Sequence, residues 1–270
     1  NMLIGGVGDN SPGGSVLDDA ILYAKNEGAK VITMSLAVGF SQAIVDAIND
    51  AYSNGVFVNN ASGNDYSGSL PFPANVGNCF AVGASNQNKL REPFSNYGPG
   101  LMVVAPGVDI KSTRKDNTYE TGGGTSYASP QVAGTAGLIA SRHPDFTSQD
   151  IEEVISLTAE KLSSYTFTDG YEYGSWNNEV GYGKLNADRA IGIKEDITSN
   201  TTLEKGNYVR DEVHVSNSST LTLAAGSKFY LLKTGQLIVD AGATLIIEDN
   251  VTISGNNSNQ IIVNGNIQLG

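Results

Sequence analysis

The sequence contains few of the residues that form disulfides or bind metals. It has one cysteine and two histidines among 270 residues. A single thiol excludes a disulfide within the chain. Cys79 is followed by Phe80, Ala81 and Val82, a pattern typical of a buried strand. We therefore interpret the thiol as a small apolar core residue.

Charged residues are also scarce, and one sign dominates. They make up 16% of the chain, with 28 acidic and 16 basic side chains and a net charge of −12. An acidic surface argues against nucleic acid or an anionic membrane as the main partner. No apolar run approaches the roughly 20 residues of a membrane span. Few cysteines and many Asn, Gly, Ser and Thr residues are typical of a secreted bacterial protein that folds without disulfides.

Helix and strand signals alternate through the first two thirds of the chain. Helix patterns cover 15–28, 41–55, 125–141 and 147–158. The residues expected to cap their starts are Ser15, Ser41, Thr125 and Thr147, the last in a capping box that extends to Asp150. Short apolar segments typical of strands cover 30–36, 56–58, 79–83 and 101–104. Strands that alternate with helices predict an α/β fold, with a parallel sheet that carries helices on both faces.

The character of the sequence changes after about residue 193, where helix signals cease. Residues 220–226 resemble 236–242, and residues 245–247 resemble 261–263, each pair with a shift of 16 residues. Short apolar strands at a fixed period favour a β-solenoid. A small antiparallel β-sandwich is the alternative. We expect a first domain at 1–194 and this small all-β module at 195–270, continuing beyond Gly270.

The most informative motif is Gly-Thr-Ser-Tyr-Ala-Ser-Pro at 124–130, continued by Gln-Val-Ala-Gly to 134. A glycine-rich loop leads directly into a helix, so Ser126 would lie at a helix N-terminus. Backbone N–H groups and the helix dipole would surround its oxygen, as an acyl-transfer oxyanion requires. Pro130 has no N–H, so the carbonyl of Ser126 lacks its usual helical partner. A serine that merely caps a buried helix is the alternative.

The eleven residues at 124–134 resemble the nucleophile motif of the subtilisin-like serine peptidases. Residues 56–64 resemble the strand of that family that ends in the oxyanion-hole asparagine. The resemblance implies that Ser126 is the nucleophile and that Asn64 donates its amide to the oxyanion. On its own, Ser-Gly-Asn-Asp at 62–65 is an ordinary turn sequence.

The resemblance also implies a substrate-binding surface. Residues 31–36 resemble the strand that pairs with the substrate backbone. The implied substrate-binding residues are Ser35, Leu36, Ala37, Ala61, Ser62, Gly63 and Thr125. Further matches at 94–99, 104–107 and 183–187 extend the resemblance over residues 1–194.

The chain departs from the family in its base and orienting acid. Nucleophilic attack by serine needs both groups, yet the family's Asp and His motifs are absent from residues 1–270. His143 ends a predicted helix, and His214 lies in the β module. The chain also begins without a signal peptide and enters an apolar stretch at 2–7. We interpret the chain as truncated at its N-terminus.

Two smaller departures concern oxidation and calcium. Tyr127 occupies a position where secreted relatives often carry an oxidisable Met. Met102 replaces an Asp that serves some relatives in a cation site near 73–79, so no metal site is expected there. No cofactor is expected for this chain, and calcium remains possible for the full-length protein.

These observations predict a secreted or cell-surface bacterial serine endopeptidase whose substrates are proteins or peptides. The chain as printed is expected to be an inactive fragment. The β module is expected to act as a spacer or to contact a cell surface or polymer. The alternative is a non-catalytic secreted or cell-surface protein that uses a degenerate peptidase fold as a scaffold or adhesion module.

Overall fold

The computed structural model describes residues 16–192, 196–203, 207–209, 212–232, 235–255 and 259–270. The chain forms two compact units, Asn1–Asn186 and Ala187–Gly270, so the division lies a few residues before position 194. The apolar stretch at 2–7 and the expected helix cap at Ser15 lie outside the described residues.

The first unit is built on a four-stranded sheet with the order β1-β2-β3-β4. Its strands are β1 (Val31–Met34), β2 (Phe57–Ala61), β3 (Phe80–Ser85) and β4 (Leu101–Pro106). All three strand pairs are parallel. In β2 and β3 every residue is buried, including Asn59 and Asn60, whose side chains are hydrogen-bonded. The sheet confirms the predicted α/β fold.

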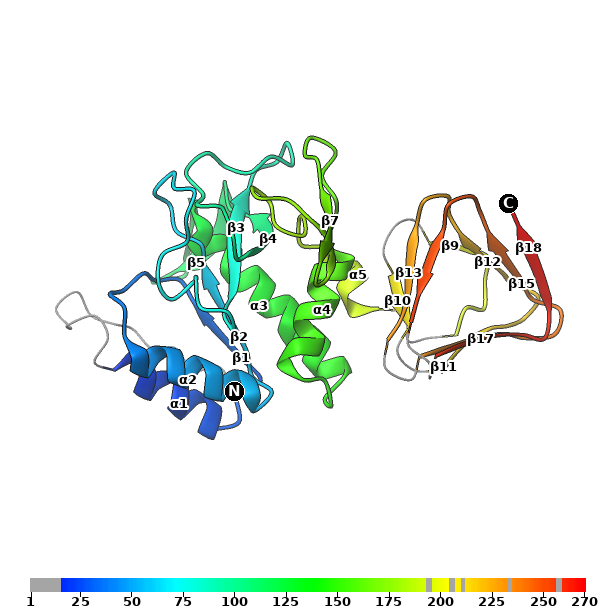
Figure 1. Ribbon diagram of the computed structural model, residues 1–270, viewed down its shortest axis with the longest axis horizontal. Helices are drawn as coiled ribbons and strands as arrows, with labels where there is room; N and C mark the ends of the chain where they lie inside the picture. The colour runs from blue at the N-terminus through cyan, green and yellow to red at the C-terminus, as the bar shows by residue number, and fades with distance from the viewer. Residues whose placement is uncertain (1–15, 193–195, 204–206, 210–211, 233–234, 256–258) are drawn as a thin grey trace. The chain divides into compact units, whose positions relative to one another are not determined.

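Helices cover both faces of this sheet (Figure 1). On one face, α1 (Leu17–Asn26) and α2 (Gln42–Ser53) share an apolar cluster with Met34, Val58 and Cys79. On the other face, Asn59 donates a hydrogen bond to the carbonyl of Ser129 in α3 (Thr125–Arg142) at 3.0 Å. Successive strand residues point to opposite faces, so α3 lies opposite α1 and α2.

The helix starts agree with the sequence in two of the three testable cases. For α4 (Ser148–Thr158), Thr147 and Asp150 form the expected capping box. For α2, Ser41 is the N-cap residue, although its side chain makes no capping bond. The expected cap of α3 is wrong, because Gly124 is its N-cap residue and Thr125 is the first residue inside.

Two antiparallel hairpins and a short helix complete these elements. They are β5 (Ile110–Arg114) with β6 (Thr118–Gly122), β7 (Thr168–Tyr171) with β8 (Gly174–Trp176), and α5 (Ala187–Ile191). The first hairpin leads directly into α3, because only Gly123 and Gly124 lie between β6 and that helix.

The second unit consists of three parallel sheets through which the chain passes in turn. One contains β9 (Thr201–Leu203), β12 (Thr220–Leu223), β15 (Thr244–Ile247) and β18 (Asn266–Leu269). The second contains β10 (Asn207–Val209), β13 (Lys228–Leu231) and β16 (Thr252–Ser254). The third contains β11 (Glu212–Val215), β14 (Gln236–Val239) and β17 (Gln260–Val263). Their parallel pairing contradicts the antiparallel sandwich.

The structure also corrects the repeat length. Glu212 pairs with Gln236, and Gln236 pairs with Gln260, so the strands of this sheet pair across 24 residues. Strand pairs near the two ends of the unit have shorter offsets, as for Asn207 with Phe229 and Thr244 with Asn266. Strands begin at eight-residue intervals, at Thr220, Lys228 and Gln236. A shift of 16 residues therefore relates strands of different sheets, and the expected 16-residue period is wrong.

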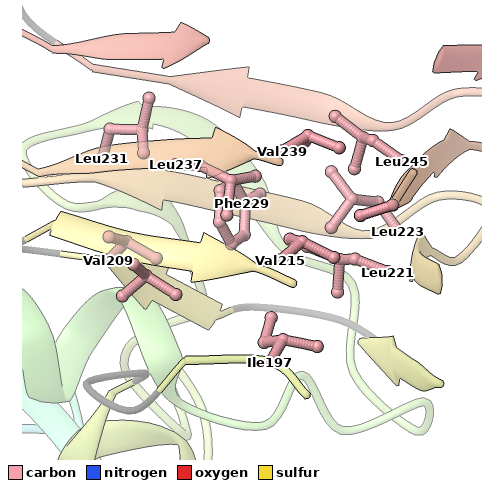
Figure 2. Packing of buried hydrophobic residues seen from close by; sticks show 12 residues of the cluster. Ile197, Val209, Val215, Leu221, Leu223, Phe229, Leu231, Leu237, Val239 and Leu245 are labelled. Carbon is pink, nitrogen blue, oxygen red and sulfur yellow. The ribbon is translucent and has the colours of Figure 1, made fainter. Parts of the chain in front are cut away.

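Apolar side chains from the three sheets meet inside this unit (Figure 2). Val213, Leu221, Leu237 and Leu245 are completely buried, while alternate residues of the same strands are more exposed. This period-two pattern is what a half-buried strand requires, and it explains the Leu-Thr-Leu alternation at 221–223.

Candidate active site

Ser126 is the second residue of α3, the longest helix among the described residues, and its side chain is exposed. The first N–H groups of a helix have no acceptor within it, and the positive end of the helix dipole lies at the same place. The loop of Gly122, Gly123 and Gly124 leads directly into α3, so Ser126 lies in the first turn of this helix, where these backbone donors are.

Pro130 removes one helical hydrogen bond at this point, and a neighbouring strand end compensates. Proline cannot donate to the carbonyl of Ser126. The hydroxyl of Ser35 instead donates to that carbonyl at 3.3 Å. The residue expected to begin the substrate-pairing segment thus lies against the first turn of α3.

Asn64 lies beside the start of α3 and is held by its side-chain oxygen. Its Oδ1 accepts hydrogen bonds from the backbone N–H and the hydroxyl of Thr125, at 2.9 and 3.0 Å. Because a backbone N–H can only donate, this contact fixes which end of the amide is oxygen. Asn64 is exposed, and its Nδ2 has no partner among the described residues.

Thr125 is therefore placed differently from expectation. Its side chain is fully buried, and both of its donors point to Asn64. In this arrangement Thr125 orients the amide of Asn64 rather than presenting its hydroxyl to a substrate.

The segment of Ser35, Leu36 and Ala37 continues the direction of β1 beyond Met34. The side chain of Asn60 accepts from the N–H of Leu36 at 3.3 Å and donates to its carbonyl at 3.0 Å. Backbone groups of successive extended residues point to opposite sides. The N–H and carbonyl groups of Ser35 and Ala37 therefore face away from β2, where an added strand would pair.

Ala61 ends β2, and the turn that follows is tied to a second loop. The buried hydroxyl of Ser62 donates to the carbonyl of Asn96 at 3.0 Å, and the N–H of Asn96 donates to the carbonyl of Gly63 at 3.0 Å. The sequence singled out residues 94–99 as a match but assigned no role to Asn96. Its contacts join residues about thirty positions apart, which no local pattern indicates.

Tyr127 packs against the glycine loop in front of the serine. A Cβ atom on Gly122 would overlap the hydroxyl and the ring of Tyr127. A larger residue at position 122 would therefore have to displace the ring of Tyr127.

Neither histidine serves Ser126 within the first unit. His143 follows the last residue of α3, is buried, and stacks on Phe146 with ring centroids 4.6 Å apart. Seventeen residues of helix at 1.5 Å per residue place it about 25 Å from Ser126. His214, in the second unit, is bonded to Asp240 at 2.8 Å and Glu212 at 3.0 Å. These two bonds raise the pKa of His214 to about 9.

Cys79 belongs to the hydrophobic core of the first unit. Cys79 is buried in the cluster below α1 and α2, and burial raises the pKa of its thiol, so it is a core residue as predicted. Among the described residues no three His, Cys, Asp or Glu side chains are arranged to hold a metal. The carbonyl of Met102, the residue considered above for a cation site, accepts a hydrogen bond from the N–H of Tyr182 at 2.7 Å.

None of the described helices combines the length and apolarity needed to cross a membrane.

Known proteins match the first unit. The sequence model of the Subtilase family (Peptidase_S8) matches residues 1–183. Subtilisin Savinase of Lederbergia lenta is 40% identical over 167 residues, which cover 62% of this chain and 61% of the relative. A thermophilic serine proteinase of Bacillus sp. (strain AK1) is 42% identical over 158 residues, 57% of this chain and 39% of the relative.

Solved structures agree. A protease from Pseudoalteromonas arctica PAMC 21717 superposes with a TM-score of 0.57 at 30% identity, covering 64% of this chain and 57% of that one. The prenylagaramide maturation protease PagA gives 0.54 at 28% identity, with 65% of each chain covered. The chain spans about three fifths of the length of Subtilisin Savinase. The family match covers more than half of the chain, and the chain belongs to the subtilase family.

Proposed function

We propose that this chain carries the nucleophile and the oxyanion hole of a serine endopeptidase. Ser126 attacks the peptide carbonyl, and the amide of Asn64 and the N–H of Ser126 bind the oxyanion. The observation that carries the proposal is the bond from Thr125 to Oδ1 of Asn64, because it leaves Nδ2 free to donate beside the serine.

Substrates in this proposal are proteins or peptides bound in an extended conformation. The outward-facing backbone groups of Ser35 and Ala37 pair with the substrate on the side before the scissile bond. Leu36 is held in place by Asn60. Ala61, Ser62 and Gly63 form one wall of the pocket for the residue before that bond.

The base and the orienting acid come, in this proposal, from a polypeptide segment outside residues 1–270. Two unpartnered surfaces support this. Among the described residues β1 pairs with β2 alone, so no described strand covers its other edge. On α3, Cβ atoms at Gly134 and Gly137 would meet nothing within 4 Å, and Leu138 is 53% exposed. These two surfaces, on the described residues, leave room for a further strand and helix.

The proposal also includes the division of the chain and its location. Residues 1–194 form the catalytic part, and residues 195–270 form a β-solenoid, supported by parallel pairing at 24-residue intervals. The protein is secreted or attached to a cell surface, where the module acts as a spacer or contacts a polymer. The scaffold alternative explains neither an exposed Ser126 nor an exposed Asn64 whose side-chain oxygen is held by the neighbouring Thr125.

The test combines labelling with complementation. The 270-residue chain alone should not react with a fluorophosphonate probe, because Ser126 lacks a base. Refolding the chain with the part of Subtilisin Savinase that contains that family's Asp and His should restore labelling and peptide hydrolysis. Within this complemented enzyme, Asn64→Ala should lower kcat about a hundredfold with little change in KM. Robust labelling of the chain alone would contradict the proposal.

A further inference from the structure

Asn96 lies on the loop after β3 and is almost completely buried, with 1% of its surface exposed. Its side-chain Oδ1 accepts hydrogen bonds from the N–H groups of Asp65 and Ser67, at 2.8 and 3.0 Å. Its Nδ2 donates to Oδ2 of Asp65 at 3.1 Å. A buried amide with both ends paired is fixed in one orientation.

The backbone around Asn96 binds the same turn. Its N–H donates to the carbonyl of Gly63, and its carbonyl accepts from the hydroxyl of Ser62. Asn96 therefore contacts the turn residues on both sides of Asn64 but not Asn64 itself.

Gly63 shows how closely the two loops fit. Its φ of +94° is a conformation that favours glycine. A Cβ atom built on Gly63 would overlap Nδ2 of Asn96. The amide of Asn96 thus occupies the space that any other residue at position 63 would fill.

We propose that Asn96 is a positioning residue that holds the turn of residues 62–67, so that the amide of Asn64 points at the oxyanion. This inference rests on the proposed function of Asn64. Thr125 fixes the side chain of Asn64, and Asn96 fixes its backbone. A displacement of about 1 Å at such a donor can cost a hundredfold in rate.

The chain offers a matched control at Asn86. Its Oδ1 also accepts two backbone N–H groups, from Asn88 and Leu90 at 3.0 and 3.1 Å. Its Nδ2 also donates to a carboxylate, that of Glu92, at 2.8 Å. The loop that Asn86 closes contains none of the proposed site residues. The change in rate of an Asn86→Ala variant therefore measures the effect of removing a similar set of hydrogen bonds away from the site.

The kinetic test uses the complemented enzyme. Asn96→Ala should lower kcat by roughly tenfold to a hundredfold with KM nearly unchanged, whereas Asn86→Ala should leave kcat within about twofold. In an Asn64→Ala background, Asn96→Ala should cost less than about threefold, because the group it positions is already gone. An equal loss in both backgrounds would overturn the inference.

A second pair of variants distinguishes the loss of the Asn96–Asp65 hydrogen bond from misfolding. Asn96→Asp places two carboxylates about 3 Å apart and should lower kcat. Adding Asp65→Asn restores a donor–acceptor pair with the roles exchanged and should recover most of the rate. Failure of the double variant to recover, in protein that is folded, would count against the inference.

Amide hydrogen exchange on the 270-residue chain gives a readout without activity. Asn96→Ala should speed exchange at Asp65, Ser67 and Thr125 at least tenfold, since the Thr125 N–H reports on Asn64. Asn86→Ala should instead speed exchange at Asn88 and Leu90. Unchanged Thr125 exchange in Asn96→Ala would refute positioning of Asn64.

The two proposals fail in different ways. If Asn64→Ala lowers kcat about a hundredfold and Asn96→Ala changes nothing, only the role of Asn96 is wrong. If Asn64→Ala leaves kcat near the wild-type value, the oxyanion assignment is wrong, and the role of Asn96 falls with it.

Discussion

Replacing Glu152 by Gln should remove most of a pH-dependent loss of stability in the first unit. Glu152 lies on α4 with only 6% of its surface exposed. The hydroxyl of Tyr52 donates to its Oε2 at 3.1 Å. Burial raises the pKa of Glu152 from 4.5 to about 7. The hydrogen bonds from Tyr52 and Tyr173 oppose this rise, while the nearby Glu172 adds to it.

The sign of the effect follows from proton binding. Between pH 4.5 and 7 the folded protein holds a proton on Glu152 that the unfolded chain has released. Stability therefore falls as the pH rises through this window, and the loss is complete above the folded pKa. A difference between 4.5 and about 7 corresponds to about 3 kcal/mol.

Glutamine keeps an acceptor for Tyr52 but cannot ionise. The free energy of unfolding of Glu152→Gln should therefore equal that of the wild type near pH 4.5. At pH 8 it should be higher by up to about 3 kcal/mol, or roughly 6–12 °C in Tm. Thermal melts of both proteins at the two pH values measure this. Glu153→Gln changes the adjacent carboxylate and is the control. Equal pH dependence in wild type and Glu152→Gln would refute the reasoning.

Three further predictions concern local features. Thr147→Ala should destabilise the first unit by about 1 kcal/mol, because it removes the capping box of α4; chemical denaturation measures the loss. The bonds of His214 to Asp240 and Glu212 should stabilise the second unit fully below pH 6.5 and be lost as the pH rises through about 9. Urea midpoints of the wild type and His214→Gln at pH 6 and 10 should therefore differ only at pH 6. Gly63→Ala should lower Tm by several degrees, because alanine would need a φ of +94°.

The nucleophile region could be predicted because its information is local. A glycine loop, a serine and a run of small residues lie within residues 122–134, and each has a direct structural consequence. Helix α3 begins at Thr125, one residue from the expectation. The cap was misassigned because Thr125 satisfies a distant asparagine instead of its own helix.

The repeat length of the second unit could not be predicted in the same way. From Glu212 to Gln236 its strands begin every eight residues and share the same alternation of less buried and buried positions. Any multiple of eight therefore gives a similar sequence match. Which multiple brings strands into register depends on how many sheets the chain visits in each turn, and only the pairing of Glu212 with Gln236 reveals it.

The arrangement around Asn64 indicates that the oxyanion hole of the proposed enzyme is formed independently of the base and the orienting acid. The side chain of Asn64 is fixed by Thr125 and its backbone by Asn96, and neither contact involves a histidine. An oxyanion hole acts through donors fixed before reaction, and it retains part of its rate enhancement when triad residues are removed. In the proposed enzyme, the segment that supplies the base therefore meets an oxyanion hole that is already ordered. Complementation should then restore kcat without moving Asn64, which amide exchange at Thr125 before and after refolding would reveal.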